Sequence, residues 1–158
     1  MQLTDLFSSS DFLLSFTPSD KWAAISQMMD HLVQIGKCDA SASEALHESV
    51  LTRERSMSTG MERGIAIPHA AVDDLTEVVA CIGLISGDDG LAFESVDGRP
   101  TQIIVLLLIP RAQKLVHIRT LADIARVLGK TSVREALLLA KTGDEALQAL
   151  AAGEAAVS

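Results

Sequence analysis

The sequence is poor in aromatic residues and in cysteine. Aromatic side chains account for 3% of its 158 residues, with no tyrosine and a single tryptophan. The hydrophobic core is therefore expected to consist mainly of aliphatic side chains and methionine. The two cysteines, Cys38 and Cys81, lie far apart in the chain and form no Cys-x-x-Cys pair. This usage argues against a disulfide framework and favours reduced thiols.

The sequence also lacks a long apolar run. Its longest, residues 103–109, is far too short to cross a bilayer but has the length of a buried strand. Residues 1–10 contain no basic region followed by an apolar stretch, so we do not expect a signal peptide. These features predict a cytoplasmic protein that does not insert into a membrane.

Positive charge is scarce as well. The formal net charge is −8, and no run of lysine and arginine offers a basic face, which argues against a nucleic acid partner. A protein partner remains compatible with this charge, because local charge need not follow the net charge. With 48% apolar and 22% charged residues, the chain reads as one globular domain over residues 1–158. We expect its core at about residues 3–150 and a frayed C-terminal tail.

Helical patterns occupy both ends of the chain. Residues 17–20, Thr-Pro-Ser-Asp, predict a helix start with Thr17 as its N-cap, and Gly36 predicts the end of that helix. The Ser-x-x-Glu pattern of residues 41–44 predicts a second helix that begins with a capping box. Further helices are expected at residues 118–128, from residue 132 onward and at residues 144–150.

The middle of the chain predicts strands separated by turns. We expect a polar loop at residues 56–64 and strands at residues 65–67, 77–86 and 101–109, with turns at residues 87–90 and 97–98. This order predicts an α/β fold, in which a single mixed β-sheet is flanked by helices on both faces.

Two of the four histidines occupy positions that suit a functional site. His31 and His47 lie inside predicted helices and read as solvated positions. His69 directly follows Pro68, where a short strand gives way to a loop. His117 lies at a predicted helix start, where the macrodipole favours an anionic ligand and a neutral imidazole. Each of them, taken alone, is also compatible with a structural role.

Polar residues just upstream of His69 are further candidates. Ser58 and Thr59 lie in the small-residue loop, which could present N–H groups to an anion. Arg53 lies at a predicted helix end, where a cation is favoured in any case. A metal site built on His69 and His117 is disfavoured, because the sequence has no His-Glu-x-x-His motif and no Cys/His cluster.

Residues 53–69 contain Arg-Glu, then Ser-Thr-Gly, then Gly-Ile-Ala-Ile-Pro-His, in that order. This segment resembles the signature of the enzyme IIA domain of the bacterial phosphotransferase system, fructose/mannitol type, a family that includes the nitrogen-regulatory IIA proteins. The similarity continues through residues 93–100, the strand that ends at Pro110 and the helix start at His117, and it covers roughly residues 3–150. The family commonly has Gly-Ile-Gly after Ser-Thr. Here residues 60–64 read Gly-Met-Glu-Arg-Gly, which adds charges near the site.

The resemblance implies roles for five residues. His69 would be phosphorylated on a ring nitrogen, and neutral imidazole suits this because its ordinary pKa of about 6.5 leaves it unprotonated at cytoplasmic pH. His117 would donate a hydrogen bond to the phosphoryl oxygens, and Arg53 would offset their charge. Ser58 and Thr59 would add weaker phosphate-binding donors. His69 and His117 would then have to meet at one edge of the sheet.

The resemblance also implies partners and leaves alternatives open. The phosphoryl donor would be an HPr-type phosphocarrier protein, and the acceptor or target would be a IIB domain or a regulatory protein. No metal or organic cofactor is needed. A nitrogen-regulatory IIA-like protein fits a chain of this length. A free-standing sugar-specific (fructose/mannitol) IIA component and a non-catalytic regulatory module that binds a partner are the alternatives.

Overall fold

The computed structural model of the chain describes residues 3–73, 75–85 and 90–157. Within these residues the strands are β1 (Phe12–Phe16), β2 (Ile65–Ala66), β3 (His69–Val72), β4 (Val79–Ile85) and β5 (Ile103–Pro110). The α-helices are α1 (Lys21–Gln34), α2 (Ser43–Ser56), α3 (Lys114–Leu128), α4 (Thr131–Leu139) and α5 (Gly143–Val157). Two short 3-10 turns, η1 (Leu3–Leu6) and η2 (Ser9–Asp11), precede β1.

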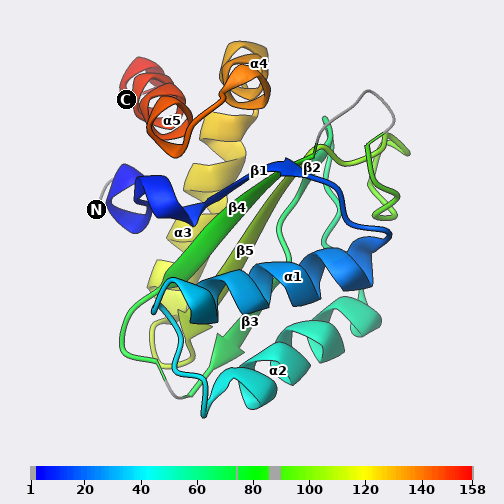
Figure 1. Ribbon diagram of the computed structural model, residues 1–158, viewed down its shortest axis with the longest axis vertical. Helices are drawn as coiled ribbons and strands as arrows, with labels where there is room; N and C mark the ends of the chain where they lie inside the picture. The colour runs from blue at the N-terminus through cyan, green and yellow to red at the C-terminus, as the bar shows by residue number, and fades with distance from the viewer. Residues whose placement is uncertain (1–2, 74, 86–89, 158) are drawn as a thin grey trace.

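The strands form one mixed sheet. Its order is β1-β4-β5, with β2 and β3 both paired to the remaining edge of β5 (Figure 1). The β4–β5 pair is antiparallel and the other pairs are parallel. Every residue of β5 is buried, as expected for a central strand that is covered on both faces. The apolar run of residues 103–109 is therefore the central strand of the fold.

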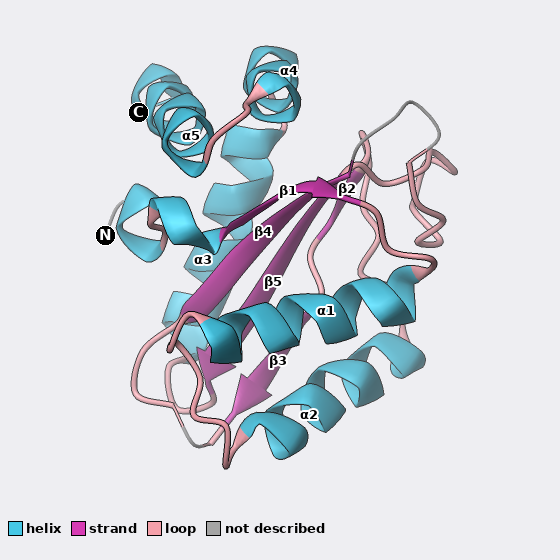
Figure 2. Cartoon of the chain, in the orientation of Figure 1, coloured by secondary structure: helices cyan, strands magenta, loops and turns pink. Residues whose placement is uncertain are grey.

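Helices cover both faces of the sheet, as predicted. Helices α1 and α2 lie side by side on one face, and α3, α4 and α5 lie on the other (Figure 2). Alternate residues of β5 serve the two layers, since successive side chains of a strand point to opposite faces. Ile104, Leu106 and Leu108 pack into the core beneath α1 and α2. Val105 and Leu107 pack into the core beneath the other three helices.

One edge of β5 carries two short strands in succession. Ile65 of β2 pairs with Ile103, and His69 of β3 pairs with Leu107. Between them, Pro68 has no N–H to donate, but its carbonyl accepts from the backbone N–H of Leu107 at 3.0 Å. The chain therefore continues along β5 beyond the proline. The prediction that the strand gives way to a loop at His69 is wrong.

The first two helices begin later than predicted. The N-cap of α1 is Asp20 and not Thr17, because the Asp20 carboxylate accepts a 2.7 Å hydrogen bond from the backbone N–H of Ala23. Helix α2 begins at Ser43 after Ala42, which makes no side-chain cap, so the predicted capping box is also wrong. The predicted end of the first helix is confirmed at Gly36, which has a φ of +80°.

The last helices are longer than predicted. Helix α3 begins four residues before residue 118, and α5 continues through Val157 where a frayed tail was expected. The Glu154 carboxylate accepts hydrogen bonds from the backbone N–H and the hydroxyl of Thr4, at 3.1 Å and 2.9 Å. This contact ties the end of the chain to its beginning. The predicted turn at residues 87–90 lies mostly outside the described residues.

Strands β1 and β3 were not predicted. In β1 the register against β4 shifts between Leu13 and Phe16, and Ser15 has a φ of +51°, so the apolar alternation is broken. Strand β3 contains Ala70 and Ala71, and alanine has low strand propensity. Pairing with buried neighbours, and not local preference, decides both strands.

Two other expectations concern membranes and thiols. Among the described residues, no helix is both long and apolar enough to cross a bilayer. Cys38 and Cys81 are buried and unpaired, in agreement with the prediction of free thiols.

Candidate active site

His69 and His117 meet at one end of the sheet. Their ring centroids lie 5.3 Å apart with an interplanar angle of 78°, an edge-to-face arrangement. His69 is the first residue of β3, and His117 lies in the first turn of α3. The predicted meeting of the two imidazoles is confirmed.

The His117 position differs from the prediction in one respect. It is the fourth residue of α3 and does not precede the helix, and its backbone N–H already donates to the carbonyl of Gln113 at 3.0 Å. What His117 offers to the site is therefore its ring and not its N–H. The ring still lies within the first turn, where the positive end of the macrodipole acts.

A hydrogen bond to the backbone orients the His69 ring. Its Nδ1 lies 2.8 Å from the carbonyl oxygen of Ile67. Because a carbonyl oxygen can only accept, Nδ1 carries the proton and Nε2 keeps its lone pair. The geometry therefore identifies Nε2 as the nucleophilic nitrogen.

The surroundings keep this imidazole neutral. Burial lowers the pKa of His69 below its ordinary value of 6.5, and the positive charge of Arg53 and the neighbouring His117 ring lower it further. The hydrogen bond to Ile67 and the Glu54 carboxylate act in the opposite direction. The net effect is a His69 ring that is unprotonated at neutral pH.

A cleft of about 720 Å³ opens over the two histidines. Helix α2 contributes Thr52 and Arg53 to its wall, β3 contributes His69, and α3 contributes His117. The predicted Arg53 is therefore brought to the site from the last turn of α2, and its Nη1 donates to the carbonyl of Met57 at 2.9 Å.

A second cation, Arg111, lines the same cleft and was missed by the sequence reasoning. Its Nε pairs with the Asp73 carboxylate at 2.9 Å, and its Nη2 donates to the carbonyl of Ala71 at 2.9 Å. The available signal was its position directly after Pro110, the last residue of β5, because residues that follow a central strand lie at the sheet end where ligands bind.

Ser58 and Thr59 do not line this cleft. The Ser58 hydroxyl donates to the carbonyl of Phe93 and accepts from the backbone N–H of Gly60 at 3.2 Å. Thr59 is buried, and both its N–H and its hydroxyl donate to the Glu54 carboxylate, at 3.0 Å and 2.6 Å. Their hydrogen bonds hold the loop in place.

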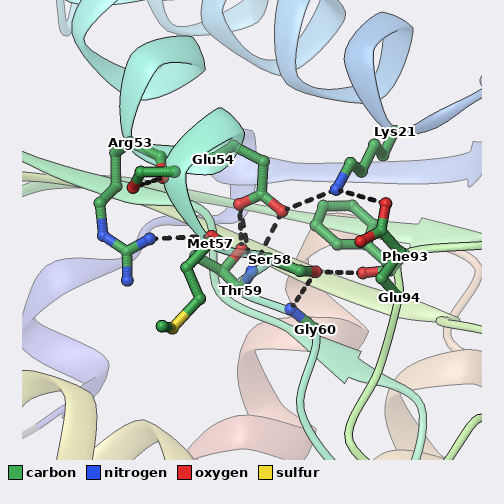
Figure 3. A network of polar contacts seen from close by, with 10 residues as sticks. Lys21, Arg53, Glu54, Met57, Ser58, Thr59, Gly60, Phe93 and Glu94 are labelled. Carbon is green, nitrogen blue, oxygen red and sulfur yellow. Dashed lines mark hydrogen bonds and ion pairs between the residues drawn. The ribbon is translucent and has the colours of Figure 1, made fainter.

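The network around Glu54 is a structural clamp at the end of α2. Figure 3 shows Lys21, Glu54 and Thr59 converging on one side of the helix end, with Arg53 extending on the other. The buried Lys21 ammonium lies 3.3 Å from the Glu54 carboxylate and also contacts Glu94 at 3.6 Å. This clamp joins the start of α1 to the loop that leads to His69. The sequence reasoning missed it, although Glu54 and Thr59 belong to the motif.

Within residues 3–73, 75–85 and 90–157, no group of three or more His, Cys, Asp or Glu side chains is placed to hold a metal ion.

Comparison with known proteins establishes the family. Residues 5–153 match the family described as phosphoenolpyruvate-dependent sugar phosphotransferase system, EIIA 2. Because this match covers nearly the whole chain, the protein belongs to that family, as its sequence motif indicated.

The chain is similar to sugar-specific and to regulatory proteins. It is 30% identical over 125 residues to the fructose-specific EIIA component of Haloferax volcanii, with 79% of each chain covered. It is 30% identical over 106 residues to the nitrogen regulatory protein of Escherichia coli strain K12, covering 66% of this chain and 64% of that one. The match to the fructose-specific EIIABC component of Bacillus subtilis is 28% identical over 144 residues. It covers 91% of this chain but 22% of that much longer protein.

Solved structures show the same fold. The crystal structure of nitrogen regulatory protein IIA-Ntr from Neisseria meningitidis superposes with a TM-score of 0.82 at 22% identity, covering 94% of this chain and 98% of that one. Enzyme IIA mannitol of Escherichia coli, in complex with phosphorylated enzyme IIB mannitol, gives a TM-score of 0.76 at 20% identity. That superposition covers 92% of this chain and 97% of the mannitol protein.

Proposed function

We propose that this protein is a histidine phosphocarrier, in which His69 accepts a phosphoryl group from an HPr-type protein. The group is then passed on or kept as a regulatory signal. The observation that carries this proposal is the pair of imidazoles in the cleft, with the Nδ1 of His69 held by Ile67 and the His117 ring 5.3 Å away.

The transfer step needs no cofactor. The Nε2 lone pair of His69 attacks the phosphorus of a phosphohistidine on the donor, and the Nε2–P bond forms as the donor's N–P bond breaks. The donor ring, protonated on its other nitrogen, leaves as neutral imidazole with the electron pair of the broken bond, and the phosphorylated His69 ring takes over the positive charge with its Nδ1 proton in place. Since imidazole replaces imidazole, the step consumes no oxidant and no nucleotide. Catalysis then consists of in-line positioning and charge stabilisation.

His117 and Arg53 supply this stabilisation. The His117 ring donates a hydrogen bond to an equatorial phosphoryl oxygen, and the Arg53 guanidinium compensates the developing charge. Arg111, which lines the same cleft, adds a second positive charge. We assign Ser58 and Thr59 no contact with the phosphoryl group, because their hydroxyls are bonded elsewhere.

The surface around the cleft suits a protein partner. Met57, Leu115 and Ile118 are each more than half exposed. Leu115 and Ile118 lie within two residues of His117 in the chain, and the Met57 carbonyl accepts from Arg53. Exposed apolar side chains around a polar centre are typical of a protein interface. We propose that the donor and the acceptor dock here in turn, in the cytoplasm. The phosphorylated IIB partner of the mannitol protein offers one precedent for the acceptor.

The regulatory branch and the sugar-specific branch remain separate candidates. The likeness to the IIA-Ntr fold and to nitrogen regulatory proteins favours a target whose activity depends on the phosphorylation state of His69. The likeness to the fructose-specific EIIA component of Haloferax volcanii favours a sugar-specific component with a IIB acceptor. In a purely regulatory module, the same surface would bind a partner without turnover.

The test is phosphorylation of the purified protein by phosphoenolpyruvate, enzyme I and either the general or the nitrogen-branch HPr. The wild type should gain one acid-labile, base-stable phosphate, and His69→Ala should gain none. His117→Ala should be labelled about 10²- to 10³-fold more slowly, the cost of removing one donor from a charge-stabilising site. Transfer of the label to a IIB domain then separates the two branches.

His31→Ala is the matched control. This imidazole lies in α1 and contacts the carbonyl of Ser10 at 2.7 Å, away from the cleft, so its loss should leave labelling unchanged. Labelling of His69→Ala would show that another residue accepts the phosphate. A wild type that no donor labels would leave the partner-binding module as the better account.

A further inference from the structure

The loop that departs from the family pattern leads to a second cluster of positive charge. Arg63 lies in this loop, and its Nη1 donates to the carbonyl of Gly129 at 2.7 Å. Arg134, from α4, donates through Nη1 to the carbonyl of Leu128 at 2.9 Å. Both arginines thus cap the C-terminal end of α3, where carbonyl groups lack helical partners.

A third arginine faces the same space. Arg63, Arg99 and Arg134 together line a cavity of about 180 Å³. Glu135 also lines it, as does Thr131, the first residue of α4. Lys130, at the N-cap of α4, makes no side-chain cap there within the described residues, so the positive end of this helix adds to the field.

Capping of α3 does not account for this arrangement. Each cap uses part of a guanidinium that has five N–H donors, and within the described residues the Arg99 side chain caps no helix end. Its side chain is 69% exposed, and its Nε forms an ion pair with the Asp97 carboxylate at 3.9 Å, a distance too long for a hydrogen bond. Burial lowers the pKa of Arg134, and the charges of Arg63 and Arg99 lower it further, while Glu135 opposes them less strongly. Positive charge therefore dominates at Arg134, in a protein whose net charge is −8.

We propose that this cavity is a second binding site, which takes a small, multiply charged oxyanion such as a phosphate ester or a di- or tricarboxylate. Guanidinium groups bind both chemistries through paired N–H donors, and three of them around a small cavity match a ligand with at least two charges. Such a ligand relieves the repulsion among Arg63, Arg99 and Arg134.

The site is separate from the His69 cleft. Among the described residues, the two cavities share no lining residue. His117 and Leu128 lie near opposite ends of α3, about 17 Å apart at the rise of an α-helix. Binding at the second site does not depend on phosphoryl transfer at His69. A ligand there would act on the protein independently of its phosphorylation.

The experiment is a calorimetric titration of the full chain in a phosphate-free buffer of low ionic strength. The probes are citrate for the carboxylate class and glycerol 3-phosphate for the phosphate esters. One probe should bind with one-to-one stoichiometry, and the stronger binder identifies the class. Arg99→Gln should raise its dissociation constant about tenfold or more, because a charge-assisted contact is lost.

Two controls keep the result specific. Arg126→Gln removes the same charge from the outer face of α3, where Arg126 pairs with Asp123, and it should change the dissociation constant less than twofold. Arg53→Gln weakens anion binding in the His69 cleft and should leave binding at the second site intact. The proposal would be overturned if neither probe binds, or if Arg99→Gln leaves the dissociation constant unchanged. It would also be overturned if Arg53→Gln abolishes binding, or if Arg126→Gln weakens binding as much as Arg99→Gln does.

Discussion

His69 donates a hydrogen bond from Nδ1 to the carbonyl oxygen of Ile67, 2.8 Å away and two residues earlier in the chain. This short local contact leaves Nε2 as the nitrogen that can attack. We therefore expect the phosphoryl group of the labelled protein to be on Nε2. Nitrogen and phosphorus NMR of the ¹⁵N-labelled phosphoprotein distinguishes the two isomers. Phosphate on Nδ1 would mean that the Ile67 contact breaks before transfer, contrary to the mechanism proposed above.

The pH dependence follows from the burial of His69. Because burial lowers its pKa below 6.5, more than half of the His69 rings are neutral at pH 6.5, and the midpoint of the loss of labelling should lie below pH 6.5. Replacing Arg53 by Gln should raise the pKa of His69, since a positive neighbour is removed. An NMR titration of the His69 ring measures both values. A midpoint above 6.5 in the wild type would contradict the effect assigned to burial.

The same shift has a consequence for stability. The unfolded chain has the ordinary histidine pKa of about 6.5 and binds a proton more readily than the folded one. The contribution of His69 to the free energy of unfolding should therefore fall as pH drops below 6.5 and be fully present above it. His69→Ala, compared with the wild type at pH 7.5 and pH 5.5 by urea unfolding, isolates this contribution.

The clamp between α2 and the loop should be costly to break. Glu54→Ala removes the acceptor of both Thr59 hydrogen bonds and leaves the buried Lys21 with the exposed Glu94 as its ion-pair partner. We expect a loss of about 3–5 kcal/mol in the free energy of unfolding, the usual cost of removing one partner of a buried ion pair. Urea unfolding followed by circular dichroism measures it.

Glu48→Ala is the matched control for Glu54→Ala. It removes a glutamate from the same helix, but Glu48 is exposed and pairs with the exposed Arg55 at 3.1 Å. Such a surface pair contributes at most about 1 kcal/mol. Similar losses in the two variants would refute the structural role assigned to Glu54.

The glycine of the Ser-Thr-Gly motif is required by close packing. A Cβ on Gly60 would lie 2.6 Å from the carbonyl oxygen of Phe93 and 3.0 Å from the Cα of Ser95, both backbone atoms. We expect Gly60→Ala to displace the loop and to lower the free energy of unfolding by about 1–3 kcal/mol. Thermal unfolding tests this, and an unchanged midpoint would show that the loop adapts freely.

The exposed apolar residues Met57, Leu115 and Ile118 should contribute to partner binding and not to the stability of the fold. Ile118 is 66% exposed beside His117, so Ile118→Lys should weaken docking of the phosphoryl donor and raise its KM with little effect on thermal stability. Leu139→Lys is the control, because Leu139 is 77% exposed at the end of α4, at the far end of the molecule from β3 (Figure 1). Equal effects of the two substitutions on KM would place the docking surface elsewhere.

Local patterns predicted the parts of the fold that depend on local chemistry. The apolar run of residues 103–109 became β5, Gly36 ended the first helix, and residues 97–98 form a turn. Patterns failed where tertiary contacts outweigh preference. Strand β3 forms from two alanines because β5 offers it a partner, and α5 extends to Val157 because Glu154 binds Thr4.

The sequence by itself determined the family and the buried strand of residues 103–109, and it selected His69, His117 and Arg53 as candidates, because these follow from the apolar run and from the motif that resembles the family's signature. Only the tertiary structure decided which polar groups meet. Ser58 and Thr59 look like phosphate ligands in the motif, yet they bond to Phe93 and Glu54. The physical reason is that hydrogen bonds and ion pairs depend on direction and distance. Whether Lys21, Glu54 and Thr59 can share one buried site is set by how α1 and α2 pack on the sheet, and no local pattern encodes that packing.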